Sequence, residues 1–310
     1  MLSRDLLKRA LPVVVTGASL LYLFSGIDLG SVIAALGADS AMILIPATVV
    51  FCVVTLSLEG LSLAILTAPT GAQATALLCA RIKAASYIAG MLNYALGIAA
   101  LSLLFKRRVG MSLTAAAGMV ATVSVTDAAM LLSVTTVAAA FYSGQSPALG
   151  FGAVALVTSG AVFGLVLLRF PGSLGPLDRV REIDLFRTVR QAPLGLLARL
   201  AVLRLCFVFA FISMGGAALA AFDVFPPVGA IIVGMAGIAL VGALPIAVAG
   251  LGTVQLATVE LFGGYSNEPN LVACSLSLQA SMLVMRMSVG AAFAREFTRE
   301  AVEATRGERT

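Results

Sequence analysis

Asp127 and Arg286 are charged residues deep inside long apolar runs. Asp127 lies about midway along the run 111–138, and Arg286 about two-thirds of the way along the run 269–294. A charge at the centre of a bilayer costs about 2.5–3.5 kcal/mol even on the mildest scale. Two roles fit these residues. They can neutralise each other as a structural pair, or Arg286 can bind a phosphate while Asp127 binds a cationic or hydroxyl-bearing group.

A break rich in proline and glycine interrupts a further apolar run, at Pro245, Gly250 and Gly252. Loose backbone at membrane depth is tolerated only where protein buries it or where it lines a polar cavity. The two glycines allow close approach of a ligand to the backbone. A helix that starts near Thr253 would present free N–H groups to an anion, and Gln255 could add a hydrogen bond. The alternative is a helix break that packs against glycine-rich neighbours.

The composition predicts a membrane protein in which most residues belong to membrane-spanning segments. Of its 310 residues, 60% are hydrophobic and 11% are charged, against about 25% charged in soluble domains. This length holds roughly six to eight spans of ~20 residues. The chain has no histidine, which removes histidine-based catalysis and histidine metal sites. We expect no enzyme activity, no cofactor and no metal, and the net charge of +5 indicates loops beside spans rather than nucleic-acid binding.

Charge placement divides the apolar runs into complete spans and hairpins. A single crossing at 86–105 would have Arg81 and Lys83 before it and the basic residues 106–108 after it. The positive-inside rule disfavours basic residues at both ends of one span. A re-entrant hairpin with Asn93 near its tip resolves the conflict, and the alternative is a thin complete span.

The same argument predicts a second re-entrant hairpin at 227–264, which enters from the outside. The expected fold is therefore an all-α polytopic membrane protein, an inverted repeat with two re-entrant helical hairpins. The halves are 1–138 and 139–310, and the second half carries a basic cytoplasmic segment at 170–199. Both termini are expected in the cytoplasm. Glu59 is expected to be interfacial, near the cytoplasmic end of its span, and paired with Arg81 or Lys83.

The chain resembles the lysylphosphatidylglycerol synthase transmembrane-region family, which includes flippase domains. The resemblance rests on Pro245, Gly250, Gly252 and Thr253 in a C-terminal signature, with Gln255 near its acidic position. It also rests on residues elsewhere in the chain, namely Asn93, Gly97, the basic turn 106–112, Asp127 and Arg286. The soluble aminoacyltransferase domain of that family is missing from the sequence, so the synthase activity is not expected.

The resemblance implies a lipid translocase that moves a phospholipid or lipid-linked headgroup across the bacterial inner (cytoplasmic) membrane. The implied substrate-binding residues are Asn93, Asp127, Pro245, Gly250, Gly252, Thr253, Gln255 and Arg286. Membrane lipids are the expected partners, with a homodimer or a lipid-modifying enzyme as further candidates. A different function is that of a non-transporting accessory protein for a glycolipid- or lipid-processing enzyme. A carrier of small solutes and a membrane transferase are two more functions to weigh.

Overall fold

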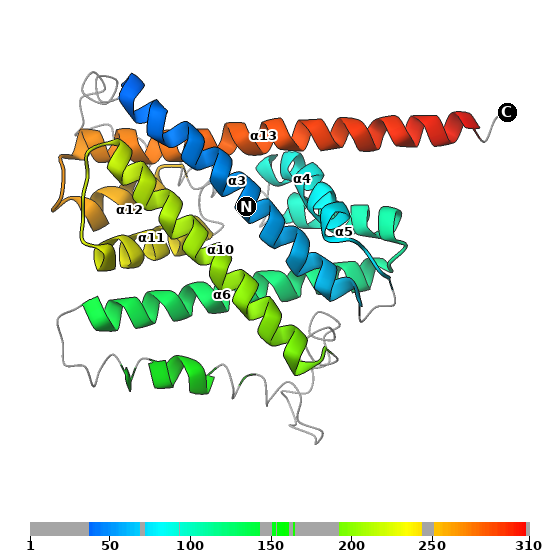
Figure 1. Cartoon of the computed structure of the whole chain (residues 1–310), viewed down its shortest axis with the longest axis horizontal. Helices are drawn as coiled ribbons and strands as arrows, with labels where there is room; N and C mark the ends of the chain where they lie inside the picture. The colour runs from blue at the N-terminus through cyan, green and yellow to red at the C-terminus, as the bar shows by residue number, and fades with distance from the viewer. Residues whose placement is uncertain are drawn as a thin grey trace, which may run out of the picture. The chain divides into compact units, whose positions relative to one another are not determined.

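The computed structural model describes residues 37–68, 72–92, 94–142, 151–152, 154–160, 164, 192–243 and 251–307. These residues form helices and turns and contain no strand, which confirms the predicted all-α fold. The helices are α3 (Ala38–Thr67), α4 (Ala76–Leu92), α5 (Tyr94–Val109), α6 (Leu113–Tyr142), α10 (Leu194–Ala221), α11 (Val228–Ala243), α12 (Thr253–Phe262) and α13 (Glu268–Gly307). Figure 1 shows α3, α6, α10 and α13 as the long helices.

Four helices are long and apolar enough to cross a membrane, namely Asp39–Thr67, Leu113–Tyr142, Leu194–Ala221 and Glu268–Arg295. Much of their apolar surface is not covered by protein. On α3, for example, Met42, Ile45 and Val50 are more than half exposed. Exposed apolar surfaces of this kind are stable in contact with the hydrocarbon chains of lipids. The sequence has two more apolar runs, at 11–27 and 149–169. The first run, which predicts a span, and about half of the second lie outside the described residues.

Hydroxyl side chains inside the long helices bond to the carbonyl oxygens of their own helix. Ser62 Oγ donates to the Leu58 oxygen at 2.7 Å, and Thr122 Oγ1 donates to the Gly118 oxygen at 2.8 Å. This local bond satisfies a polar group that has no water partner in a bilayer. Serine and threonine are therefore compatible with the spans that the apolar runs predict.

The helix starts follow ordinary capping chemistry. Thr75, Ser112 and Asn267 stand directly before α4, α6 and α13. Each side-chain oxygen accepts a backbone N–H three residues later, at 3.2, 3.2 and 3.0 Å. Such N-caps satisfy N–H groups that the first helical turn leaves without a partner. They set the places where the chain turns into a new helix.

Two pairs of shorter helices form hairpins. Helices α4 and α5 pack side by side (Figure 1) and contact each other where Gly90 meets Gly97. A Cβ on Gly97 would lie only 2.7 Å from the Gly90 Cα, so the close approach requires a glycine there. Helices α11 and α12 also contact each other, and Gly234 leaves room for the ring of Phe262. Helical hairpins therefore form at both predicted places, the first with longer arms than 86–105.

The chain divides into two compact units. Unit 1 comprises Met1–Phe51, Leu131–Val157 and Val208–Met282, and unit 2 comprises Cys52–Met130, Thr158–Phe207 and Leu283–Thr310. Each long helix contributes one part to each unit. Unit 1 also holds the α11–α12 hairpin, and unit 2 holds the α4–α5 hairpin. Each unit takes residues from both predicted halves of the chain.

The core of unit 2 packs the hairpin against the long helices. Leu63 and Leu66 of α3, Ile82 of α4, Phe105 of α5 and Met119 of α6 are almost completely buried in one cluster. Leu200 of α10 belongs to the same cluster. Helix α10 begins at Leu194, so the end of the predicted basic segment 170–199 belongs to this helix, and residues 170–191 lie outside the described part of the chain.

Candidate functional site

Glu59 of α3 is a buried carboxylate between two cations. Its side chain is 7% exposed. Oε1 lies 3.2 Å from Lys83 Nζ of α4, and Oε2 lies 3.3 Å from Arg204 Nη1 of α10. The predicted pairing of Glu59 with Lys83 is therefore confirmed, but the carboxylate is buried among protein side chains and is not interfacial as predicted. The second partner, Arg204, was not predicted.

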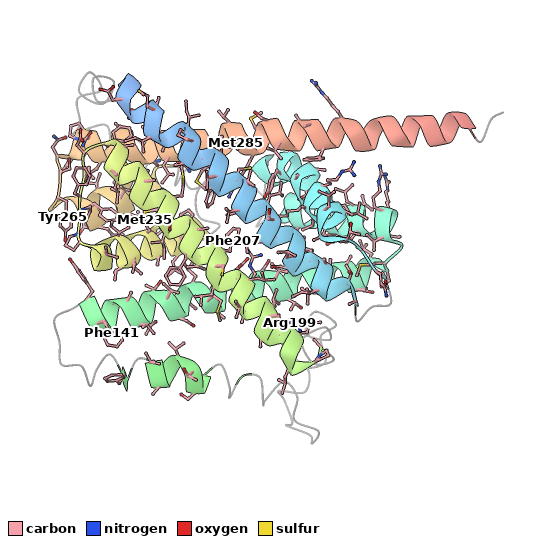
Figure 2. All side chains as sticks on the ribbon, viewed as in Figure 1. Phe141, Arg199, Phe207, Met235, Tyr265 and Met285 are labelled. Carbon is pink, nitrogen blue, oxygen red and sulfur yellow. The ribbon has the colours of Figure 1, made fainter. Side chains whose placement is uncertain are left out.

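Arg204 is the centre of the network. Its side chain is completely buried, and its Nε lies 2.7 Å from Asp127 Oδ1 of α6. The guanidinium also lies over the ring of Phe207, with Cζ 4.3 Å from the ring centroid; Figure 2 labels Phe207 on α10. Residues three apart share one face of a helix, which explains the contact. An arginine so placed is held by charge and by the face of an aromatic ring.

The contacts of Arg204 are ion pairs rather than well-aligned hydrogen bonds. None of its three side-chain nitrogens has a hydrogen-bond partner among the described residues. Nε and Nη1 have a carboxylate oxygen within ion-pair distance, whereas Nη2 has neither kind of contact there. A buried donor without an acceptor is unfavourable. Nη2 is therefore a buried donor without an acceptor among the described residues.

Asp127 corrects the predicted pairing. The structure joins it to Arg204 and not to Arg286, and no ion pair links Asp127 with Arg286 among the described residues. The apolar run that starts at residue 200 places Arg204 near its end, where an arginine would be interfacial. Because α10 begins at Leu194, Arg204 lies well inside the helix instead. The Asp127 side chain is 35% exposed, so it is the open end of the network.

Arg286 of α13 lies next to the network rather than in it. It is exposed, and its Cζ lies 5.8 Å from the ring centroid of Tyr87 on α4. Tyr87 in turn lies within the electrostatic influence of Lys83, Glu59 and Arg286. Helix α13 packs closely on α4 at this point, because a Cβ on Gly290 would lie 3.1 Å from the Ala84 carbonyl oxygen.

All of these charged residues belong to unit 2, and each long helix supplies one of them. Glu59 comes from α3, Asp127 from α6, Arg204 from α10 and Arg286 from α13. Lys83 of the α4–α5 hairpin completes the set. The arrangement can bind and release an ion or an ionic headgroup, since it brings two carboxylates and three cations together within apolar helices.

The predicted site residues of the second hairpin lie in unit 1. Gly252 has a φ of 84°, a backbone conformation that favours glycine, directly before α12. The Gly252 N–H donates to Gln255 Oε1 at 2.6 Å, and Gln255 Nε2 donates to Gln279 Oε1 of α13 at 2.8 Å. Gln255 is completely buried. Thr253 is the first residue of α12, and Asn93, Pro245 and Gly250 lie outside the described residues.

The buried amide of Gln255 therefore has a structural role that can be tested. Gln255→Ala removes the acceptor of the Gly252 N–H and the donor to Gln279. We expect it to lower the free energy of unfolding by about 1–3 kcal/mol, because it leaves buried polar groups without partners. Thermal unfolding of the purified protein in detergent measures the loss. Gln73→Ala, at an exposed glutamine before α4, is the control, and equal stability of the two variants would contradict the role.

The four long apolar helices and the buried charge network define the chain as a multi-pass α-helical membrane protein. No family model, curated protein or solved structure matches the chain. The resemblance to the lysylphosphatidylglycerol synthase transmembrane-region family stays a prediction.

Proposed function

We propose that the protein is a flippase-like lipid translocase, which moves a phospholipid or lipid-linked headgroup across the bacterial inner membrane. The headgroup would pass along polar side chains inside the helices while the acyl tails stay in the bilayer. The observation that carries the proposal is the network of charged side chains from α3, α4, α6 and α10 in unit 2, with Arg286 of α13 beside it. Charges in membrane helices usually mark a pathway for an ion or a substrate.

The charge balance of the site favours an anionic headgroup. Lys83 and Arg204 offset Glu59 and Asp127, and Arg286 adds a positive charge beside Tyr87. Arginine binds phosphate oxygens through several N–H groups in one plane. Arg286 is exposed, so it is the residue that a phosphate can reach first. In this proposal the phosphate binds Arg286, and Asp127 forms a hydrogen bond with a hydroxyl group of the same headgroup.

The basic residues are concentrated in one of the two units, which supports a cytoplasmic location for the helix ends that carry them. The described residues of unit 1 include no lysine or arginine, and their acidic residues are Asp39, Asp223, Glu260 and Glu268. The described residues of unit 2 include Arg81, Lys83, Lys106, Arg107, Arg108, Arg199, Arg204, Arg286 and Arg295. Under the positive-inside rule, the basic ends are cytoplasmic.

The charge pattern assigns each long helix a proposed direction, inward for α3 and α13 and outward for α6 and α10. The α4–α5 hairpin would then be re-entrant from the cytoplasm and the α11–α12 hairpin from the outside, as in an inverted repeat. Both termini would be cytoplasmic.

Cysteine labelling tests the first hairpin. In a background without the exposed Cys206, we expect Gln73→Cys and Lys106→Cys to react from the same, cytoplasmic side. Tyr265→Cys, at an exposed residue of unit 1 that Figure 2 labels, should react from the opposite side. A membrane-impermeant thiol reagent on intact and opened cells measures both. Opposite accessibility of positions 73 and 106 would make the hairpin a complete crossing.

A reconstitution assay tests the function itself. Purified protein in liposomes is given a panel of labelled phospholipids and labelled soluble solutes, and movement across the bilayer is followed for each. Movement of a phospholipid supports the proposal. If only soluble solutes move, the protein is a carrier of small solutes. If nothing moves, the proposal fails in favour of an accessory role beside a lipid-processing enzyme.

A further inference from the structure

Glu59 and Asp127 share Arg204, but their surroundings are unequal. Glu59 is 7% exposed and has a second cation, Lys83, at 3.2 Å. Asp127 is 35% exposed, and Arg204 is its only ion-pair partner among the described residues. The carboxylate with fewer cationic partners is the one that binds a proton more readily, because a neighbouring cation stabilises the ionised form. In this network that carboxylate is Asp127.

The groups that face Asp127 come from three other helices. Arg204 of α10 attracts its negative charge, Lys83 of α4 adds a weaker attraction, and Glu59 of α3 repels it. Helix α6 contributes no other acidic or basic residue. An ionised carboxylate that is partly open to a bilayer is unfavourable, whereas a neutral carboxyl group is tolerated. Asp127 therefore stays ionised only while its ion pair with Arg204 is kept.

Protonation of Asp127 changes the net charge of the network by one. With Asp127 ionised, Lys83 and Arg204 balance Glu59 and Asp127, so the sum is zero. When the Asp127 carboxyl group binds a proton from water, it becomes neutral. Lys83 and Arg204 then face Glu59 alone, so the sum is one positive charge.

We infer that Asp127 is the proton-binding group of this site, and that a proton and an anionic headgroup occupy the network together. The second half of this inference rests on the proposed lipid translocation. The positive charge of one proton on Asp127 and the negative charge of one phosphate bound at Arg286 sum to zero, so the loaded site carries the same net charge as the empty site. This balance avoids moving an isolated charge through the membrane.

Infrared spectroscopy of the wild-type protein tests proton binding without any transport. Protein in phosphatidylcholine liposomes is titrated with acid, and the carbonyl stretching band of a protonated carboxyl group is followed. We expect a band that shifts when the protein contains aspartate labelled with carbon-13 at the side-chain carboxyl group. Asp127→Asn should remove this band. Asp223→Asn, at an exposed aspartate of unit 1, should retain it.

The outcomes decide the inference directly. A band that ignores the aspartate label, or one that survives Asp127→Asn, overturns the assignment to Asp127. Because the labelled wild-type protein is measured first, a folding defect of Asp127→Asn does not mask a negative result. Asp127→Glu provides a further check. It keeps a carboxyl group at this position, but its band should no longer shift when the aspartates of the protein are labelled with carbon-13.

Reconstitution with a pH gradient tests the coupling. Labelled phosphatidylglycerol, as the anionic probe, should move faster when the side from which it starts is acidic, and Asp127→Asn should lose this dependence. Lipid movement that ignores the gradient in the wild-type protein overturns the coupling. A titrating Asp127 band without movement of any lipid retains the proton site but contradicts the proposed function, so the two failures are distinguishable.

Discussion

Arg204→Met should destabilise the protein more than any other single substitution of a charged residue in α10. It leaves Glu59 with Lys83 alone and leaves Asp127 without an ion-pair partner among the described residues. Removing one member of a buried ion pair is worth about 3–5 kcal/mol, because the remaining charge stays uncompensated. We expect a large loss of folded protein on solubilisation, and a lower midpoint of thermal unfolding for the remainder. Arg199→Gln, an exposed arginine of the same helix, should unfold like the wild type.

A double variant separates charge from packing. Arg204→Met leaves the network with one surplus negative charge, and the addition of Asp127→Asn restores the balance through Lys83 and Glu59. The double variant should therefore recover part of the lost stability, while the contact of Arg204 with Phe207 stays lost. Equal stability of Arg204→Met and Arg199→Gln would show that the network does not hold unit 2 together.

The places where the chain breaks could be predicted from the sequence because local chemistry decides them. Basic residues on both sides of 86–105 required a reversal, and the chain reverses between α4 and α5. The glycine-rich break before residue 253 predicted an interrupted helix, and Gly252 indeed has a positive φ. Both features depend on charge and backbone freedom near the break. Neither depends on which helices are neighbours.

The ion-pair partners could not be predicted in the same way. Asp127 and Arg286 occupy equivalent elements of the proposed halves, and that symmetry suggested a pair. The actual partner depends on how α6, α10 and α13 rotate about their axes, and hydropathy does not define rotation for helices that are apolar on every face. The signal that could have identified Arg204 is its position, one turn inside an apolar run, with Phe207 three residues later.

The network also links the two proposed halves of the sequence. Glu59, Lys83 and Asp127 precede residue 139, whereas Arg204 and Arg286 follow it. The first half thus supplies both carboxylates and the second half supplies both arginines. Each half alone would bury unbalanced charge, so the ion pairs favour the association of the halves.

Arg286→Ala should abolish most lipid movement while the protein remains folded. Arg286 is exposed, and no ion pair joins it to another described residue, so its removal leaves no buried charge behind. If it binds the headgroup phosphate, the loss is that of a charge-assisted hydrogen bond, about 1.5–3 kcal/mol. This corresponds to a decrease in transport rate of roughly 10- to 100-fold. The reconstituted lipid assay and thermal unfolding, measured on the same preparations, separate transport from stability.

Two further variants define what Arg286 contributes. Arg286→Lys keeps the positive charge but loses the planar set of donors, so it should recover only part of the transport. Arg295→Ala removes an exposed arginine from the same helix and should transport like the wild type. If Arg286→Ala unfolds as readily as Arg204→Met, the residue is structural. If Arg286→Ala transports lipid at the wild-type rate, the phosphate of the headgroup does not bind at Arg286, and Arg204 and Lys83 are the remaining cations of the site.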